Sequence, residues 1–591
     1  MTNPRSEYER RLAGWRRRLD ELDRRHLLLS NVRIALAVAG GVLLWQAFVR
    51  ASIPAWWPVA DWLLFGGIAV HHARVLNGRD RARRAAALYE RGIDRLNDRW
   101  PGRGRGGADF GEGHPYARDL DLFGRASLFE LLNTARTEAG EATLADWLRG
   151  PAPADEVRAR QAAVAELRPR VDFREDVAVL AAESPVGRTG PLAAWALSPP
   201  VGFPAPLAPA CLASAIVTVA LAALAYERVV ERVWPMLWIL VATTAAALWR
   251  KQVHHVLHSI ETPERDLGLL AELLARIERE PFDAPRLVAV REALAVRGVA
   301  ASRSIARLRA IVSWGDATHN LLFGPIAYVL LIRQQLAIAI DRWHRDHGPA
   351  IAGWLRAVGD AEALSAFATY AFEHPGDPFP AIVEAPPHFD ARGLAHPLLP
   401  TLVAVRNDVR LGGDARAIVV SGSNMSGKST LLRAVGVNVV LAMSGAPVRA
   451  EALGLSPLVL GATLRIDDSL EAGHSRFYSE ILRLRGIVDA ARGPVPLLFL
   501  LDEILHGTNS HDRRIGAEGV VRALLRLGAI GLVTTHDLAL TELAEQLDGV
   551  LNVHFADHVE DGRMVFDYRM RPGVVEHSNA LALMRAIGLE V

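Results

Sequence analysis

One short motif restricts what this chain can fold into more than any other part of its sequence. Residues 422–429 read GSNMSGKS and fit the phosphate-binding pattern G-x-x-x-x-G-K-[ST]. The apolar run Ala417 to Val420 precedes the motif, and a helical pattern starts near Thr430. The glycines allow a tight loop whose backbone N–H groups face phosphates at a helix N-terminus. The motif therefore predicts an α/β P-loop domain that binds a nucleoside triphosphate.

The lysine of this motif stands out against the composition of the chain. Of 67 basic residues, only Lys251 and Lys428 are lysines, and the other 65 are arginines. The wide planar fork of an arginine does not replace a compact ammonium at the β- and γ-phosphates, so this position needs lysine. The residues predicted to bind ATP are Gly422, Ser423, Asn424, Met425, Ser426, Gly427, Lys428, Ser429 and Thr430, and Lys428 is also predicted to act in catalysis.

A second part of the same site follows about 75 residues later. The apolar run Leu497 to Leu501 ends in Asp502 and Glu503. An aspartate at this position holds Mg²⁺ in P-loop enzymes, and the serine after the lysine, here Ser429, is another ligand. Glu503 is expected to polarise or deprotonate the attacking water. The predicted cofactors are therefore ATP and Mg²⁺.

Three apolar runs alternate with helical stretches after about residue 400. They span 417–422, 496–503 and 529–537, and the third ends near His536, which can contact the γ-phosphate or the water. Short buried strands separated by helices indicate a parallel sheet. Residues 550–559 and 563–569, on either side of Asp561-Gly562, predict a hairpin beside that sheet.

These motifs resemble those of the MutS family. GSNMSGKST (422–430) is similar to that family's P-loop. LLFLLDEILHGTNSHD (497–512) is similar to its Asp-Glu strand and the loop that follows that strand. RIDDSLEAGHSRFYSEI (465–481) resembles the family's signature segment, and PGVVEHSNALALMRAIGL (572–589) its closing helix. FGRASLFELLNTARTEAGEATLADWL (123–148) resembles the start of its helical core. The similarity covers 396–591 and much of 115–395.

The resemblance implies an ATPase that works as a homodimer. It implies that Ser475 reaches across the dimer to the γ-phosphate of the other subunit, and that DNA, double-stranded, mismatched or branched, is a partner. The chain departs from the family at its N-terminus, where nothing resembles the mismatch-reading domain, and Phe129-Glu130-Leu131 lies inside the helical core instead. A role in mismatch repair or recombination is thus an implication of the family alone.

Four long apolar runs predict membrane helices. They are Ile34 to Val49, Val59 to Val70 with Asp61 inside, Leu207 to Tyr226, and Val233 to Trp249. About 20 apolar residues span a bilayer, and a buried core helix is the alternative for each run. The hydrophobic content of 50% and the mean hydropathy of +0.14 are high for a soluble protein. We expect two helical hairpins in a lipid bilayer.

The charges beside the first two runs predict their orientation. Residues 1–33 contain nine arginines and residues 71–105 contain ten, whereas the loop between the runs contains only Arg50. The positive-inside rule places both flanks in the cytoplasm. The expected location is a bacterial-type inner or plasma membrane, with several crossings and a cytoplasmic ATPase domain.

The remaining segments are predicted to be helical. Tyr8, Leu12, Trp15, Leu19 and Leu22 form one stripe of a helix over 5–28, which fits a helix on the membrane, a coiled-coil dimer seam or a solvated helix. Leu321 to Ile332 predicts a buried helix. His254, His255 and His258 follow the fourth run, and interfacial polar residues are preferred over a metal site because a third ligand is not evident.

The predicted organisation has five parts. They are a basic amphipathic helix at 1–33, a transmembrane hairpin at 34–75, a basic linker and helix at 76–114, a helical domain like the MutS core at 115–395 interrupted by a second hairpin at 207–250, and a MutS-type P-loop ATPase domain at 396–591.

Composition excludes some classes of function and leaves others open. A net charge of +1 gives no general basic field for nucleic acid, and the single Cys211 excludes a disulfide framework and a cysteine-rich zinc site. The main hypothesis is a membrane-anchored ATPase that acts on DNA. An ATP-driven machine for membrane remodelling or transport, or an ATP-switched scaffold, remains an alternative without any role for DNA.

Overall fold

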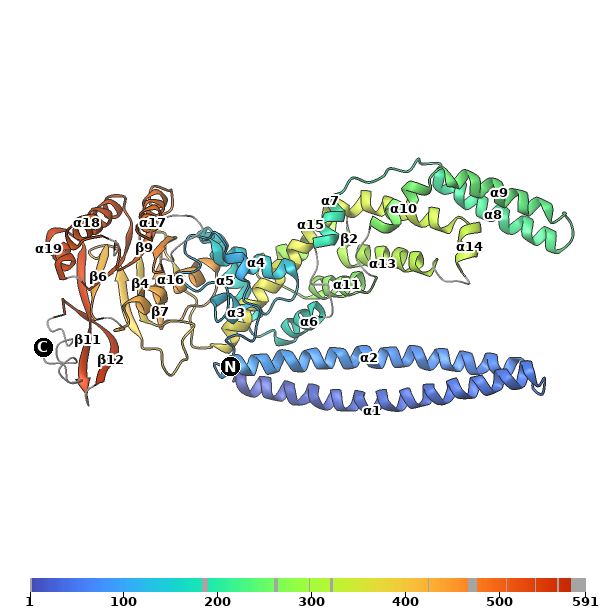
Figure 1. Ribbon diagram of the computed structural model, residues 1–591, viewed down its shortest axis with the longest axis horizontal. Coiled ribbons are helices and arrows are strands. Elements are labelled where there is room, and N and C mark those ends of the chain that lie inside the picture. The colour runs from blue at the N-terminus through green and yellow to red at the C-terminus, as the bar shows by residue number, and fades with distance from the viewer. Residues whose placement is uncertain are drawn as a thin grey trace.

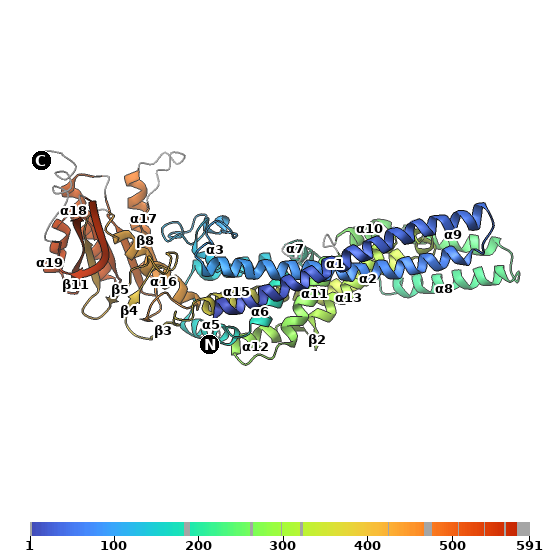
Figure 2. The same cartoon turned by 90° about the horizontal axis from the view of Figure 1, so that it is seen from below.

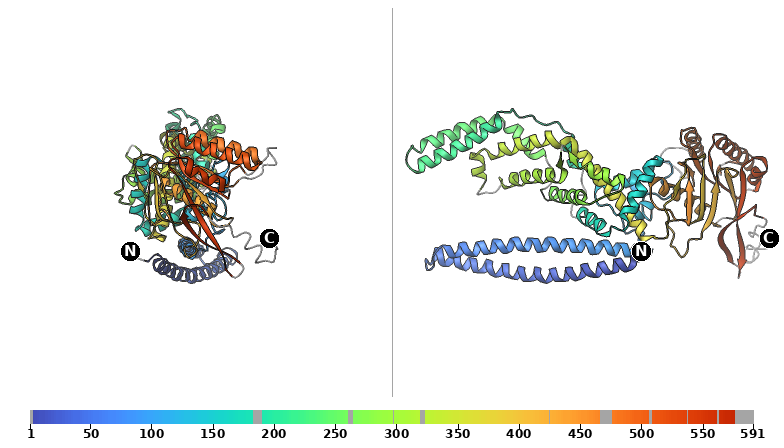
Figure 3. Two further views of the ribbon diagram at one scale, coloured as in Figure 1. Left: turned by 90° about the vertical axis from the view of Figure 1, so that its left-hand side faces the viewer. Right: turned by 180° about the vertical axis from the view of Figure 1, so that it is seen from behind.

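The protein is elongated, with an α/β domain at one end and the tips of two helical hairpins at the other (Figure 1). The computed structural model describes residues 3–182, 190–259, 264–296, 298–318, 323–423, 425–465, 476–505, 508–536, 538–560 and 563–575. Seen from below and from behind, both hairpins still point away from the α/β domain (Figures 2 and 3). The nucleotide motifs and the most apolar surface therefore lie at opposite ends.

The α/β domain is built on a six-stranded sheet with the order β12-β11-β6-β10-β9-β8. Its strands are β6 (Ala417–Ser421), β8 (Val459–Thr463), β9 (Leu497–Asp502), β10 (Ile530–Thr535), β11 (Val550–Glu560) and β12 (Arg563–Pro572). Neighbouring strands are parallel, except that β11 and β12 form an antiparallel pair. The three predicted strands and the predicted hairpin are confirmed, and β12 extends three residues beyond the expected end at residue 569.

Helices cover both faces of this sheet. They are α16 (Lys428–Ser444), α17 (Arg476–Ala490), α18 (Ser510–Arg526), the 3₁₀ turn η4 (Leu538–Glu542) and α19 (Leu543–Gln546). Alternate residues of β9 point to opposite sides: Leu498 and Leu500 join the core that includes α16, whereas Phe499 and Leu501 join the core under α17 and α18. Burial on both faces explains why these strands are continuously apolar in sequence.

A smaller sheet adjoins the main one. Its strands are β3 (Ala381–Ile382), β4 (Phe389–Leu394), β5 (Asn407–Leu411) and β7 (Ala452–Leu455), in the order β3-β7-β4-β5. The amide of Asn407 on β5 donates to the backbone oxygen of Tyr568 on β12 (3.0 Å) and its oxygen accepts from the N–H of Met570 (2.7 Å). The two sheets are thereby joined at the strand that carries Tyr568.

The middle of the molecule is helical, with one long helix as its axis. Helix α15 (Ile332–Glu373) has 42 residues and contacts α4, α5, α7, α10 and α13 along its length. The other elements are η2 (Ala108–Gly111), α3 (Leu128–Leu132), α4 (Glu138–Arg149), α5 (Ala154–Leu167), α6 (Val171–Ala181), α7 (Gly190–Leu197), α10 (Arg250–Ser259), α11 (Glu264–Arg279), α12 (Pro285–Glu292), β1 (Ala295–Val296), β2 (Val299–Ala300) and α13 (Ala301–Ala317).

The first hairpin consists of α1 (Pro4–Leu44), the π-helical turn η1 (Trp45–Val49) and α2 (Trp56–Leu96). Helix α1 is continuous through residue 33, where the sequence predicts the start of a membrane segment. The predicted stripe faces α2 and the helical region: Tyr8 and Leu12 pack with Tyr89 and Phe372, and Leu22 packs with residues of α2. Because the chain itself covers this stripe, it does not lie on a membrane or form a dimer seam.

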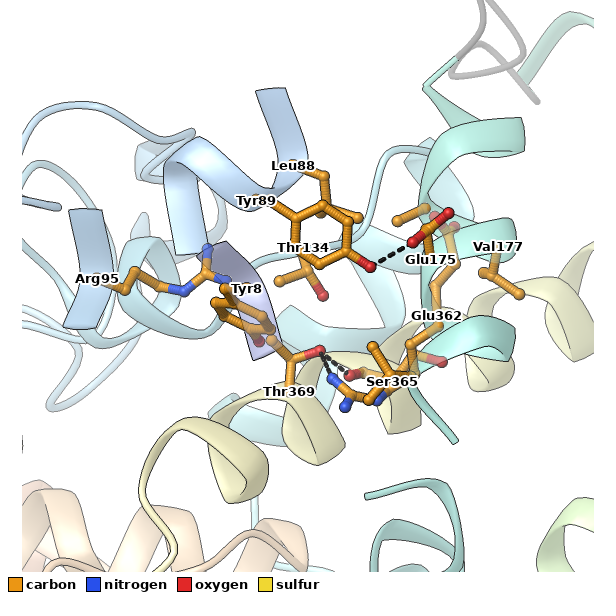
Figure 4. Close-up of a pocket in the computed structure, with 13 residues that line it drawn as sticks. Tyr8, Leu88, Tyr89, Arg95, Thr134, Glu175, Val177, Glu362, Ser365 and Thr369 are labelled. Carbon is orange, nitrogen blue, oxygen red and sulfur yellow. Dashed lines mark hydrogen bonds between the residues drawn. The ribbon is translucent and has the colours of Figure 1, made fainter. Parts of the chain in front are cut away.

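A buried polar cluster attaches the base of this hairpin to the helical region (Figure 4). Arg95 of α2 forms an ion pair with Glu373 at the end of α15 (2.6 Å), and the Tyr8 hydroxyl donates to the same carboxylate (3.1 Å). Tyr89 donates to Glu175 of α6. Because each buried carboxylate has a cation or hydroxyl donor, the cluster fixes the position of the hairpin without leaving a charge unpaired.

The second hairpin, α8 (Leu207–Tyr226) and α9 (Val233–Ala247), exposes apolar side chains around most of its surface. Two described helices are long and apolar enough to cross a membrane: the one spanning Pro4–Val49, and α8. Helix α9 qualifies only together with α10, and the two are bent by 67°. The predicted second run, Val59 to Val70, does not qualify by length and composition.

One predicted element differs from the structure. The first two residues of the predicted buried helix, Leu321 to Ile332, lie outside the described residues. The rest forms a short helix, α14 (Gly324–Val329), followed by a break at Leu331 in the left-handed region (φ 54°). Ile326 and Tyr328 are 52% and 58% exposed, so the prediction of burial is wrong for these two side chains. The apolar composition was interpreted as a core segment, but composition alone does not distinguish a core from another apolar surrounding.

Candidate nucleotide-binding site

The P-loop joins β6 to α16 at the carboxyl end of the central strands. Gly422 (φ 149°) and Gly427 (φ 106°) adopt backbone angles that favour glycine. A Cβ at Gly422 would lie 2.9 Å from the Ser426 hydroxyl oxygen, and one at Gly427 would lie 3.1 Å from the Tyr568 ring. The loop therefore needs both glycines to turn tightly and to approach its neighbours. Met425 is 84% exposed at its tip.

The ammonium of Lys428 lies within this loop. Its Nζ donates to the backbone oxygens of Gly422 (2.8 Å) and Ser423 (2.9 Å) and lies 3.4 Å from Oε1 of Glu503. The side chain is 5% exposed. A buried ammonium is stable only with such partners, and phosphate oxygens are of the same kind. The predicted place of Lys428 at the phosphates is therefore compatible with the geometry.

The ends of β9 and β10 place the carboxylates beside the P-loop. The Thr534 hydroxyl donates to Oδ1 of Asp502 and accepts from the N–H of Glu503 (3.1 Å). Glu503 adopts a left-handed backbone (φ 45°), which is strained for a residue with a side chain. Nδ1 of His536 lies 3.5 Å from Oε2 of Glu503. One threonine thus orients both carboxylate residues, and His536 lies within reach of Glu503.

The P-loop and the two carboxylates line a cavity of about 660 Å³. Its polar part contains Lys428, Ser429, Asp502 and Glu503. Its apolar part is formed by residues of the small sheet and of the β11–β12 hairpin: Leu394, Ala395, His396, Leu399, Val403, Val405, Phe555 and Tyr568. Burial and the nearby Arg433 lower the pKa of His396 to about 4, so this ring is neutral at physiological pH. A cavity with one polar and one apolar part suits a phosphorylated ligand with an aromatic base.

The residues of the cavity fit ATP with a bound Mg²⁺. The buried hydroxyl oxygens of Ser423 and Ser426 have no hydrogen-bond partner within the described part of the chain, so the loop has polar groups left to satisfy. The described residues contain no group of three or more His, Cys, Asp or Glu that could hold a metal by themselves. Mg²⁺ usually takes one or two protein ligands together with phosphate oxygens and water, which Ser429 and Asp502 could provide.

Several predicted site residues lie outside the described residues. They are Asn424 of the loop and Ser475 of the signature segment. The chain on either side of residues 466–475 is nevertheless anchored. Asp119 accepts from the N–H groups of Leu464 (2.9 Å) and Arg465 (2.7 Å) and lies 3.1 Å from Arg483 of α17. The start of the helical region thus fixes both ends of the signature segment, which the sequence analysis did not anticipate.

Two further residues of the site, Thr534 beside the carboxylates and Tyr568 in the cavity wall, were missed from the sequence. The sequence analysis treated Thr534 only as part of the strand that ends near His536. Its hydroxyl, at the end of a strand next to the one with Asp502, was a signal for a hydrogen bond between the two strand ends. Tyr568 has a left-handed backbone (φ 55°) and contacts the P-loop across about 140 residues of sequence. No local signal identifies such a contact.

Comparison with known proteins gives the same picture of the C-terminal region. Residues 418–590 match the family model of MutS domain V. The chain is 32% identical over 255 residues to the DNA mismatch repair protein MutS of Brevibacillus brevis, which covers 42% of this chain and 29% of that protein. It is 34% identical over 195 residues to the endonuclease MutS2 of Thermus thermophilus, covering 33% of this chain and 25% of the relative.

A third relative, the DNA mismatch repair protein MutS 2 of Halobacterium salinarum, is 33% identical over 262 residues, or 44% of this chain and 29% of the relative. The chain therefore spans less than a third of the length of these curated relatives. The range matched by the family model, residues 418–590, includes the P-loop and both carboxylates of the cavity. The C-terminal region is therefore a MutS domain V with an ATPase-type α/β fold, and this domain relates the chain to the MutS family.

Proposed function

We propose that this protein is a membrane-anchored ATPase of the MutS type, which binds and hydrolyses ATP as a homodimer and acts on DNA. The observation that carries the ATPase part is the meeting of Lys428, Asp502 and Glu503 around one cavity, although they come from different strands and loops. A structural ion pair alone would not need the adjoining apolar pocket or the unsatisfied hydroxyls of the loop.

Each residue has a distinct role in this proposal. Lys428 and the loop N–H groups hold the phosphates, and Ser429 and Asp502 hold Mg²⁺, which supplies positive charge at the phosphoryl group. Glu503 accepts a proton from the attacking water, and His536 orients Glu503 or the water. The serine at 475 of a second subunit completes the site, so that ATP joins two ATPase domains and hydrolysis separates them.

The apolar part of the cavity is proposed to hold the adenine base. Tyr568 presents an aromatic ring at the wall of the cavity, next to the P-loop, and its strand is fixed there by the two hydrogen bonds of Asn407. A base stacked on this ring would have its phosphates directed toward Lys428. Aromatic stacking favours bases in general, so the ring provides affinity more than selectivity.

The membrane part of the proposal rests on the two hairpins. Their exposed side chains include Val38, Val42, Phe48, Leu63 and Leu64 on the first, and Ile216, Val219, Leu237, Leu240 and Val241 on the second. Exposed apolar patches of this extent are unfavourable in water. We propose that both hairpins enter a bacterial-type inner or plasma membrane, with the arginine-rich bases of the helices and the ATPase domain in the cytoplasm. The helix over Pro4–Val49 and α8 are long and apolar enough to cross it by themselves, and the apolar parts of α2 and α9 are proposed to cross it as their hairpin partners.

The role of DNA is supported by the names of the relatives, two of which are DNA mismatch repair proteins and one an endonuclease. This chain covers only 25–29% of those proteins. A second function is favoured by a specific observation: the apolar hairpins lie at the end of the molecule opposite the cavity (Figure 1). This arrangement also suits an ATP-driven machine that remodels or transports within a membrane, without DNA.

One set of measurements tests these proposals. The full chain is expressed in a bacterial host, and its membrane fraction is washed with carbonate and then extracted with detergent. We expect extraction only by detergent; release by carbonate would contradict the anchoring.

ATP hydrolysis by the purified protein is then measured with homoduplex, mismatched and branched DNA at several salt concentrations. Stimulation that weakens with salt supports a DNA role, and no stimulation at any salt favours the membrane machine.

A further inference from the structure

A third apolar element lies beside the second hairpin. It consists of the end of α13, helix α14 and the first residues of α15, and it exposes Trp314 (57%), Ile326 (52%) and Tyr328 (58%). The sequence from Leu321 to Ile332 contains no charged residue. Neighbouring Ile311 and Val312 pack against the helical core instead. Three large side chains are thus left outside the core where the chain turns from α13 into α15.

This element is packed against the hairpin and not separate from it. Helix α14 contacts α9, and the start of α15 contacts α8. Leu331 is buried with Cys211 of α8 and with Ala242 and Ala246 of α9. Figure 1 shows α14 below the half of the hairpin that is nearer its base, on the side that faces the first hairpin.

The packing partners give the depth of the element along the hairpin. Cys211 lies four residues after the first residue of α8, and Ala242 lies five residues before the last residue of α9. Ala246 lies one residue before that end. At 1.5 Å per helical residue, the partners of Leu331 lie between about 2 and 8 Å beyond the base of the hairpin. Interfacial segments bury their apolar side chains about 5–10 Å into the headgroup and acyl boundary. The depth therefore matches a segment that enters one leaflet without crossing it.

The surroundings of the hairpin decide what covers this element. Helix α8 has 20 residues, of which only Cys211, Thr218 and Ala225 are buried, so apolar side chains point outward in most directions. A protein partner would cover one side of the hairpin, whereas a lipid bilayer would surround it. Arg333 follows the apolar segment directly, where a cation would meet lipid headgroups. Tryptophan and tyrosine are typical of this boundary.

We propose that the end of α13 from Trp314 on, together with residues 323–332, forms a monotopic element that inserts into the cytoplasmic leaflet of the same bilayer as the hairpins, with Trp314, Ile326 and Tyr328 in contact with lipid. This inference rests on the proposed membrane anchoring and adds to it. Such an element would attach the first turn of α15 to the membrane. The other end of α15, at Glu373, leads into strand β3 of the small sheet within eight residues.

The single cysteine of the chain makes the test practical. In a Cys211→Ala background, one cysteine is introduced at Ile326, Tyr328, Ile216 or Ala490 and labelled with a nitroxide. Ile216 lies in α8 and is 61% exposed, and Ala490 is exposed at the end of α17 in the α/β domain. The full-length proteins are reconstituted in vesicles of phosphatidylethanolamine and phosphatidylglycerol. Relaxation by oxygen, which enriches in lipid, is compared with relaxation by a water-soluble nickel chelate.

We expect labels at 326, 328 and 216 to favour oxygen over the chelate and the label at 490 to show the reverse. If 326 and 328 behave like 490 while 216 favours oxygen, the inference is wrong and the anchoring stands. If 326 and 328 are shielded from both reagents, a protein surface covers them and the inference is also wrong. If 216 itself favours the chelate, the anchoring fails. The ATPase rate of each labelled protein shows that its fold is intact.

Discussion

The ammonium of Lys428 and the carboxylate of Glu503 lie 3.4 Å apart at the mouth of the P-loop, and the ammonium also donates to two loop carbonyls. A triphosphate that enters the loop has to take over these contacts. Its arrival would also draw the ammonium away from Glu503, whose carboxylate is then available to a water molecule. In the proposed mechanism, the same pair would thus link binding of the phosphates to preparation of Glu503 as the general base.

Replacing Lys428 with alanine is expected to weaken ATP binding by two orders of magnitude or more. Removing one member of a buried charge pair costs about 2–5 kcal/mol, and here the phosphates lose their only lysine partner. Lys428→Arg should also bind poorly, because the planar fork does not fit the loop. Equilibrium binding of a fluorescent ATP analogue measures both. Lys251→Arg is the matched control, and an unchanged affinity in Lys428→Ala would refute the P-loop assignment.

The Glu503→Gln variant should bind ATP normally but hydrolyse it about 10²–10⁴ times more slowly, the usual contribution of a general base. Because ATP persists, the proposed dimer should accumulate and elute early in size-exclusion chromatography with ATP and Mg²⁺. Glu545 is exposed on α19, away from the cavity, and Glu545→Gln provides the control. Wild-type turnover in the glutamine variant would remove Glu503 from the role of base.

Much of this site could be predicted because its signals are local in sequence. The P-loop follows from one octapeptide, and Asp502 and Glu503 follow from the apolar strand before them. Tyr568 could not be predicted, because its place depends on pairing between β11, β12 and the P-loop and on the bridge from Asn407. Long-range contacts of this kind are set by the fold and not by the neighbouring residues.

The helical half illustrates a different limit. The stripe of Tyr8, Leu12 and Leu22 was predicted correctly as one face of a helix, but periodicity does not say what covers that face. The structure covers it with α2 and α15. The segment from Leu321 to Ile332 has the composition of a core helix, yet it leaves Ile326 and Tyr328 exposed. An amphipathic or apolar pattern predicts which face of a helix is apolar. What covers that face is decided by the tertiary structure.

Tyr568→Ala is expected to raise the dissociation constant for ATP about 5- to 30-fold, because stacking of a base on an aromatic ring contributes about 1–2 kcal/mol. Tyr568→Phe keeps the ring and should bind ATP like the wild type. Binding of inorganic triphosphate, which has no base, should be equal in all three proteins. An equal loss of triphosphate binding in Tyr568→Ala would indicate a disturbed P-loop and not a base contact.

Glu373→Ala should release the first hairpin from the helical region. The variant leaves Arg95, whose side chain is 10% exposed, without its ion-pair partner, a change that usually costs about 3–5 kcal/mol. Hydrogen exchange should become faster in α1 around Tyr8 and in α2 around Arg95, while α16 keeps its protection. Glu384, with a 70% exposed side chain, provides the control Glu384→Ala. Unchanged exchange in α1 would show that the remaining contacts, such as those of Tyr89 and Arg11 with Glu175, hold the hairpin without Glu373.

Glu362 of α15 should make the helical region less stable as the pH rises. Burial, which outweighs the hydrogen bonds from Thr137 and from the N–H of Arg136, raises the pKa of this carboxyl from 4.5 to about 7. The folded state therefore holds a proton that the unfolded state releases, so stability is greatest below pH 4.5 for this group and falls between pH 4.5 and 7. The loss amounts to about 3 kcal/mol at most. Glu362→Gln removes the ionisation, so its melting temperature relative to the wild type should increase from pH 5 to pH 7.5. A difference that does not change with pH would show that Glu362 is ionised in the folded protein throughout this range.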